Sequence, residues 1–184
     1  MPSPHRGPVK THTPPGDNRP RQVCESCGFI HYVNPRMVVG ALCLWEDKIL
    51  LCRRAIEPRS GLWTLPAGYL ELNETTEEAA RRETHEEAGA EIEIDALLAI
   101  YALRHISQVQ LIYLARLLGP GFAPGPESAE VRLFGWEELP REEIAFPSVD
   151  WALDRYAEVR GRESFQPASN PGGETGEMSA KRAT

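Results

Sequence analysis

The feature that most constrains this chain is the segment Gly68–Ala90, which reads GYLELNETTEEAARRETHEEAGA. Near its end three carboxylates stand at positions i, i+3 and i+4: Glu83, Glu86 and Glu87. On a helix with about 3.6 residues per turn, these side chains fall within an arc of about 100°. Like charges at this spacing repel one another, whereas Mg²⁺ and Mn²⁺ bind carboxylate oxygens. The spacing therefore favours a divalent-cation site on one edge of a helix over a solvated acidic face.

Local residue chemistry predicts where this helix begins and ends. Thr75 and Glu78 form a Thr-x-x-Glu capping box, which places the helix start near Thr76. Gly89 fits the left-handed residue that closes a helix. A narrow face of small residues would let the helix lie close on a sheet, with its acidic edge toward a cleft: Ala80, Thr84 and Ala88.

The full spacing of Gly68–Ala90 resembles the signature of the Nudix hydrolases. That signature reads Gly-x5-Glu-x7-Arg-Glu-U-x-Glu-Glu-x-Gly-U, with U an apolar residue, and every glycine and charged position is matched. Thr84 and Ala90 at the two U positions are mild departures. Each fixed residue type has a background frequency of about 5–7%, so a chance match is improbable.

The resemblance implies an α/β domain of the Nudix fold, a mixed β-sheet sandwiched between helices. Apolar patterning predicts strands and a C-terminal helix at 37–44, 49–54, 62–65, 92–103, 109–117, 131–136 and 148–160, the last being the helix. We expect four segments: a disordered N-terminal arm at 1–22, a zinc-ribbon-like knuckle at 23–36, the Nudix domain at 37–160, and a disordered tail at 161–184.

The resemblance also implies an activity, the metal-dependent hydrolysis of a nucleoside diphosphate linked to another group, giving two monophosphates. The stretches CGFIHYVNPR, LPAGYLE and FAPGPESAEVRLF are similar to a branch associated with FAD and related dinucleotides, so the expected substrates are FAD, ADP-ribose or NADH. Two alternatives stay open: a nucleotide-sensing regulatory module without turnover, and a nucleic-acid-binding zinc module. Intact carboxylates weigh against the first, and a net charge of −7 weighs against the second.

Matching positions suggest roles for the acidic residues. Glu83, Glu86 and Glu87 are expected to hold Mg²⁺ or Mn²⁺, directly or through water, together with the carbonyl oxygen of Ala67. Because Glu83 would act on the transition state through the cation, it is also expected to be catalytic. Glu74 fits a supporting or capping role better than that of a ligand.

Arg82 is expected to orient Glu83 or to contact phosphate, with a surface salt bridge as the alternative. The general base can come from the box or from a later loop in this family. Glu130, at the head of a strand, is favoured over Glu127, and an exposed strand-edge carboxylate is the alternative for both.

Substrate contacts are predicted at three places. Arg53 and Arg54 end a strand and could meet phosphate, the alternative being a solvated strand end. Gly68 lets backbone approach a metal or phosphate. Tyr69 could stack on a base or isoalloxazine ring, although most such aromatics are core residues. A strand junction supplies further residues for the mouth of the cleft: Arg104, His105 and Gln108.

The cysteines divide into two pairs. Cys24 and Cys27 resemble half of a zinc ribbon, but tetrahedral zinc takes four ligands and no earlier Cys pair exists. The substitutes are histidines without diagnostic spacing, His5, His12 and His31, and the alternative is a metal-free knuckle. Cys43 and Cys52 lie within apolar strands and are expected to be small core residues.

Composition bounds the remaining expectations. No apolar run approaches the ~18 residues of a membrane span, and the N-terminus lacks an apolar signal region. We therefore expect a cytoplasmic protein with a small nucleotide as its partner and without a membrane or nucleic-acid partner. A homodimer is suggested by the resemblance alone.

Overall fold

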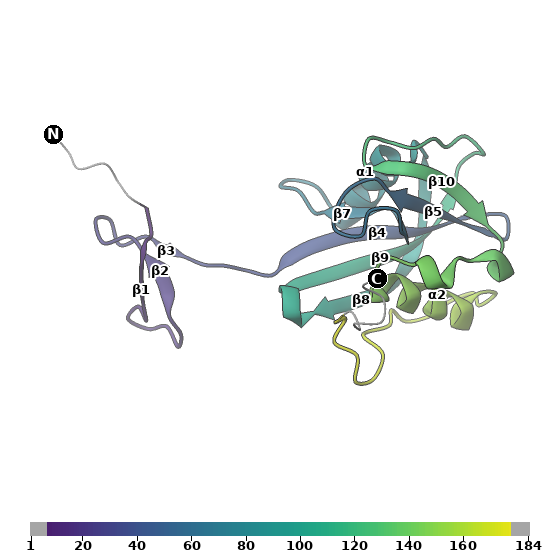
Figure 1. The fold of residues 1–184 in the computed structure, drawn as a ribbon. Helices are drawn as coiled ribbons and strands as arrows, with labels where there is room; N and C mark the ends of the chain where they lie inside the picture. Colours follow the sequence, from purple (N-terminus) through teal and green to yellow (C-terminus); the bar gives the residue numbers. More distant parts are fainter. Residues whose placement is uncertain (1–6, 178–184) are drawn as a thin grey trace. The chain divides into compact units, whose positions relative to one another are not determined.

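The structure is a computed structural model that describes residues 7–177. It divides into two compact units, residues 1–35 and residues 36–184. The smaller unit is a three-stranded antiparallel sheet in the order β1-β2-β3 (Figure 1), with strands at Lys10–His12, Arg21–Val23 and Ile30–His31.

Strand β1 and most of β2 fall within the range 1–22 that the sequence predicted to be a disordered arm. The strands are short and β1 is fully exposed, so they leave no apolar periodicity in the sequence. Local polar contacts hold the unit instead. Arg21 donates to Asp17 at 3.0 Å, and its guanidinium lies 5.1 Å from the ring centre of Tyr32.

The larger unit contains a seven-stranded sheet whose main path runs β10-β5-β4-β9-β8, with β6 paired to β5 and β7 paired to β4. The β4–β9 pair is parallel and the other pairs are antiparallel, so the sheet is mixed, as predicted. In chain order from β4 the strands are Arg36–Trp45, Lys48–Arg54, Trp63–Thr64, Ala67–Tyr69, Ile92–Leu103, Gln108–Leu117 and Ser128–Phe134.

Two helices cover opposite faces of this sheet, α1 at Thr76–Ala88 and α2 at Pro147–Val159 (Figure 1). Three 3-10 turns join the elements, at Arg104–Ile106, Trp136–Glu138 and Arg141–Glu143. The predicted sandwich of a mixed sheet between helices is confirmed. Among the elements, β7 is the one in the larger unit that the apolar pattern did not predict.

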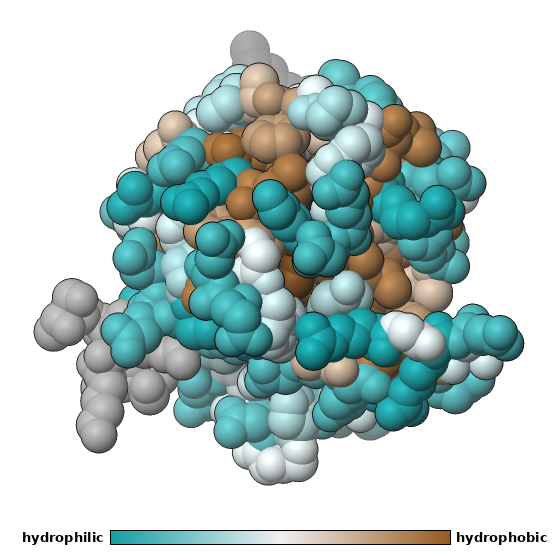
Figure 2. Space-filling model, turned by 90° about the vertical axis from the view of Figure 1, so that its right-hand side faces the viewer, coloured by the Kyte–Doolittle hydropathy of each residue, from teal (hydrophilic) through white to brown (hydrophobic). Residues whose placement is uncertain are grey.

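Alternation along the strands builds two cores, one for each helix. Val39 and Cys43 of β4 pack with the small residues of α1, whereas Leu42 between them packs with α2. Cys43 and Cys52 are buried free thiols, as predicted, and burial raises the pKa of Cys43 to about 12. Figure 2 shows one face of the molecule, where hydrophilic residues surround hydrophobic ones near the centre.

The C-terminal segment differs from the expected disordered tail in the part that the structure describes. Residues 161–177 contain no helix or strand, yet Ala168 forms a bridge with Ala99 of β8. Asn170 hydrogen-bonds to Ala102 of the same strand. These are backbone and single-amide contacts that leave no periodic signal. Between residues 7 and 177, no helix is long and apolar enough to cross a membrane.

Candidate active site

Helix α1 begins and ends at the residues that its sequence predicts. The Thr75 hydroxyl accepts a hydrogen bond from the Glu78 N–H at 3.2 Å, and the Thr75 N–H donates to the Glu78 carboxylate at 2.7 Å. Gly89 adopts the left-handed conformation, with φ of 59°, and donates to the His85 carbonyl. The predicted face of Ala80, Thr84 and Ala88 is buried. The acidic edge of the helix is thereby fixed in rotation against the sheet.

Position 68 accepts only glycine without rearrangement, because its backbone lies against the Glu83 side chain. Strand β7 brings the Gly68 backbone so close to α1 that a Cβ atom at this position would overlap the Glu83 carboxyl group. The Glu83 side chain therefore lies directly over the loop, and the residue is only 8% exposed. The glycine and the first carboxylate of the acidic triplet form one packed unit.

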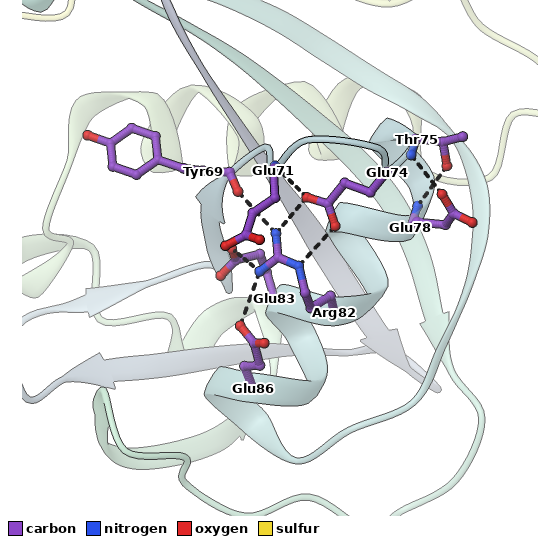
Figure 3. A network of polar contacts seen from close by, with 8 residues as sticks. All are labelled: Tyr69, Glu71, Glu74, Thr75, Glu78, Arg82, Glu83 and Glu86. Carbon is purple, nitrogen blue, oxygen red and sulfur yellow. Dashed lines mark hydrogen bonds and ion pairs between the residues drawn. The ribbon is translucent and has the colours of Figure 1, made fainter.

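Arg82 is the centre of a carboxylate network, drawn in Figure 3. It donates from Nε and Nη2 to both oxygens of Glu74, at 3.0 and 2.7 Å, in a bidentate pair. Its Nη1 donates to Glu83 at 2.6 Å and to Glu86 at 3.1 Å. Nη2 also donates to the Tyr69 carbonyl at 3.0 Å, which ties the end of β7 to α1.

This network sets the protonation states of its members. The hydrogen bond from Arg82 lowers the pKa of Glu74 to about 2, and the same bond raises that of Arg82. The pKa of Glu83 is raised, chiefly because burial removes its carboxylate from water, and Arg82 partly opposes this. Arg82 thus bonds to Glu83, and Glu74 in turn bonds to Arg82.

Glu87 is the second buried carboxylate of α1. Its Oε2 accepts a hydrogen bond from the Ala67 N–H at 3.1 Å, the one protein donor that its carboxylate has among the described residues. Burial raises the pKa of Glu87 to about 7, and the neighbouring charges of Glu83 and Glu127 act in the same direction. Two carboxylates with raised pKa values therefore share one wall.

The Gly/Pro-rich loop 119–126 closes the C-terminal end of α1. Ala123 and Gly125 donate backbone hydrogen bonds to the carbonyls of Ala88 and Glu87, at 2.8 and 3.1 Å. These carbonyls have no partner within the helix. A side chain at Gly125 would overlap the Glu86 carbonyl. The loop consequently delivers the next residue but one, Glu127, to the acidic wall.

These elements surround one cleft of about 940 Å³. It is lined by most of the predicted site residues: Ala67, Gly68, Tyr69, Arg82, Glu83, Glu86, Glu87, His105 and Gln108. At its rim Tyr69 is half exposed, and the Arg36 guanidinium lies 5.3 Å from the Tyr69 ring centre. Tyr69 is therefore accessible for stacking on a ligand.

Three residues that the sequence predicted for the site or the mouth of the cleft do not line it: Arg53, Arg104 and Glu130. Arg53 and Glu130 pair with each other across β5 and β10 at 3.7 Å, and neither lines the cavity. A β-bulge between Ser128 and Glu130 shifts the register there, and such a shift re-aims side chains. Glu127 and Arg54 line the cleft in their place. The sequence named Arg54 together with Arg53, and Glu127 together with Glu130. It did not show which residue of each pair faces the cleft.

The donor set of this wall fits a hard divalent cation. Glu83 and Glu87 are buried carboxylates, and the charge of Glu83 helps to raise the pKa of Glu87. Glu86 and Glu127 line the same cleft. Across residues 7–177, no three His, Cys, Asp or Glu side chains already converge as a metal cage, since Glu86 is turned toward Arg82. Mg²⁺ needs only one or two carboxylates plus water and substrate oxygens.

The smaller unit holds the two predicted knuckle cysteines. Cys24 is buried and Cys27 exposed, and both are free thiols. The Ser26 hydroxyl and the backbone N–H groups of Cys27 and Ser26 lower the pKa of Cys24 to about 7. Backbone bonds from Gly28 to Cys24 and from Cys24 to Phe29, both 2.8 Å, form the turn.

Two family models match the chain. The model described as NUDIX domain matches residues 34–153, which includes β4 through most of α2. The model described as Nudix N-terminal, a zinc-ribbon family, matches residues 6–33. The boundary between the two compact units, after residue 35, lies two residues inside the start of the NUDIX match.

Known proteins agree with these matches. A crystal structure of a NUDIX hydrolase from Nitrosomonas europaea has a TM-score of 0.84 and 49% identity, covering 89% of this chain and 94% of that one. An ADP-ribose pyrophosphatase of Methanocaldococcus jannaschii is 29% identical over 60% of this chain and 68% of its own length. A NAD-capped RNA hydrolase of Stutzerimonas stutzeri is 33% identical over 72% of this chain, which spans about half (49%) of that relative.

Proposed function

Since this chain belongs to the Nudix hydrolase family, we propose that it hydrolyses the diphosphate bond of a nucleoside diphosphate linked to another group, using Mg²⁺ or Mn²⁺. The oxygen of water forms a bond to one phosphorus, the bridging P–O bond breaks, and two monophosphates leave. The observation that carries this proposal is the pair of buried carboxylates, Glu83 and Glu87, on the wall of the cleft.

Glu83, Glu86 and Glu87, with the Ala67 carbonyl, would hold the cation. When bound, a divalent cation neutralises the diphosphate and lowers the pKa of a water molecule. The Arg82 guanidinium, held by Glu74, fixes the orientation of Glu83 and leaves Glu86 the more exposed, adjustable member.

Glu127 is our candidate for the general base, in place of Glu130. It lines the cleft and lies near enough to Glu83 and Glu87 to raise the pKa of both. Its backbone is anchored, because its carbonyl accepts a hydrogen bond from the Ala55 N–H at 2.8 Å. Glu130 is committed to Arg53 outside the cleft.

The substrate we favour is ADP-ribose or a NAD-related dinucleotide, ahead of FAD. Support comes from the names of two relatives, an ADP-ribose pyrophosphatase and a NAD-capped RNA hydrolase. A cleft of about 940 Å³ has room for groups on both sides of a diphosphate. Tyr69 and Arg36 at the rim offer a ring and a cation to one of these groups, and Arg54 offers a second cation.

A nucleotide-sensing module without turnover is the alternative function. It would use the same cleft but would not need Glu83, Glu86 and Glu87 together with an arginine that orients them. The cytoplasmic location, the homodimer and the four-segment division of the chain stay predictions.

A substrate screen tests the proposal. The purified chain would be incubated with ADP-ribose, NADH, FAD, NAD-capped RNA and nucleoside triphosphates, each with Mg²⁺ or Mn²⁺. We expect AMP release to be fastest from ADP-ribose or NADH and to require the cation. Cation-dependent binding without monophosphate release from any compound would favour the sensing module.

A further inference from the structure

The described end of the chain is pinned along the outer edge of β8, the edge strand of the sheet. We refer to residues 165–176 as the C-terminal strap. Phe165 packs against the core on the α2 side, and the Gln166 carbonyl accepts a hydrogen bond from Arg155 at 2.7 Å. Ala168 then exchanges two backbone hydrogen bonds with β8, at 2.8 and 3.1 Å. In Figure 1 this segment runs past β8.

The Asn170 side chain holds the strap to β8, and we refer to it as the clasp. Its amide accepts from the Ala102 N–H at 2.8 Å and donates to the Ala102 carbonyl at 3.1 Å, as a paired strand would. The same amide donates to the Glu174 carbonyl at 3.1 Å, and the Glu174 N–H donates to Pro171. One side chain therefore holds both the strand edge and the turn that follows it.

The turn brings Gly176 to the cleft. Gly176 is buried, has φ of 78°, and is so close to Leu103 that a Cβ atom would overlap the leucine side chain. Both Gly176 and Leu103 line the cleft. Leu103 belongs to the core on the α2 side, whereas Glu83 and Glu87 come from the helix on the opposite face. The strap thus lies across the cleft from the carboxylates.

Part of this side of the cleft is apolar and uncharged. Leu103, Ile112 and Val149 line the cleft and belong to one core cluster, and Gln108, the β9 partner of Leu103, lines it with an uncharged amide. These four side chains offer no positive charge to a phosphate. Such a wall suits an uncharged ring that can be packed between apolar surfaces.

We propose that the C-terminal strap forms a wall of the substrate cleft that packs against the nucleobase, and that Asn170 is the positioning residue that holds this wall closed. The proposal rests on the proposed function, since it concerns the same nucleotide site. It adds a segment outside the matched NUDIX domain, which ends at residue 153, to the part that binds substrate.

Two matched glycine substitutions and one clasp variant test the proposal. Gly176→Ala puts a methyl group against Leu103 in a left-handed backbone, whereas Gly119→Ala, outside the strap and the cleft, puts one into open space without a positive φ. Asn170→Ala removes the clasp. We expect the KM for ADP-ribose to rise at least about fivefold in Gly176→Ala and Asn170→Ala, with kcat within about threefold of wild type. Gly119→Ala should leave both unchanged, and melting curves would show that all variants fold.

Hydrogen exchange gives a readout that does not depend on turnover. The amides of Ile100 and Ala102 donate to the strap, so their exchange reports whether it is closed. AMP should slow their exchange in the wild type and not in Asn170→Ala, and ribose 5-phosphate, which lacks a base, should have little effect.

The two readouts separate the strap from the proposed function. Equal KM values in Gly176→Ala and Gly119→Ala would overturn the proposed role of the strap while leaving the hydrolase intact. If no nucleotide is hydrolysed, the proposed function fails, and the exchange of Ile100 and Ala102 still decides the strap. Exchange that AMP does not slow, or that ribose 5-phosphate slows equally, would overturn it.

Discussion

Two regions carry sequence motifs: the loop and helix at Gly68–Ala90, and the cysteine turn at Cys24–Cys27. They differ in whether the motif side chains contact one another. In the first, the motif residues contact one another: Gly68 makes room for Glu83, Arg82 joins Glu74 to Glu83, and Ala67 holds Glu87. In the second, backbone hydrogen bonds account for the turn, and the two thiols are half of a zinc ligand set. A motif is informative when its members explain each other's positions.

The largest expected effect is the loss of a buried carboxylate. Glu83→Gln and Glu87→Gln should each lower kcat by about 10² or more, because each removes a charge that acts on the transition state. Steady-state kinetics with ADP-ribose and Mg²⁺ would measure this. Glu91→Gln is the matched control, since Glu91 is exposed and pairs with His85 beyond the helix. Near wild-type turnover in either buried variant would remove the assigned role.

The next effect concerns the glycine that makes room for Glu83. Gly68→Ala places a methyl group in the position of the Glu83 carboxyl, so the carboxylate must move, and we expect kcat to fall by about 10-fold to 100-fold. Gly119→Ala is the control, because open space surrounds Gly119. If both variants turn over equally, the packed unit of Gly68 and Glu83 does not matter for catalysis.

A stability measurement tests the burial of the cleft carboxylates without any substrate. The pKa of Glu87 is about 7 in the folded protein, above its usual value of 4.5, so the folded state holds this proton more tightly than the unfolded state. The free energy of unfolding should therefore fall as the pH rises from about 4.5 to about 7, by roughly 3 kcal/mol, since the two pKa values differ by about 2.5 and one pKa unit corresponds to about 1.4 kcal/mol.

Urea unfolding in the presence of a chelator, at several pH values, would measure this fall. Glu87→Gln should make the fall in that window smaller, and the part that remains is expected from Glu83, whose pKa is also raised. The pKa of Glu74 is lowered, so its contribution changes only below about 4.5 and does not overlap. An equally steep fall in Glu87→Gln would assign the effect to other groups.

The smallest expected effect is in the cysteine turn. Replacing Cys24 and Cys27 together by serine should change kcat and KM by less than about twofold, because the turn is held by its backbone. Elemental analysis of the purified chain should find less than about a tenth of an equivalent of zinc. A full equivalent that the double variant loses would show that the turn is a metal site, and the contrast between the two regions would disappear.

Much of this site could be predicted from sequence because its information is local. The capping box, Gly89 and the spacing of Glu83, Glu86 and Glu87 all lie on one loop and helix, where period and chemistry specify geometry. The sequence named Glu127 and Arg54 as candidates but could not rank them above Glu130 and Arg53, since strand register, including a bulge in β10, decides which residue lines the cleft.

The contacts near the two ends of the described chain left no signal in the sequence for a related reason. Strand β1 and the segment around Asn170 pair through backbone and amide groups, and such pairing needs no apolar period in the sequence. The parallel pairing of β4 with β9 likewise joins segments far apart in the chain, so it could be expected only from the resemblance.

The most direct test of the central claim is a Mn²⁺ titration followed by electron paramagnetic resonance, with AMP present. Our account predicts saturable binding with a Kd below about 1 mM in the wild type, weakened at least about tenfold when Glu83 and Glu87 are both replaced by glutamine. Equal Mn²⁺ binding by the wild type and the double variant, or no saturable binding by the wild type, would contradict it.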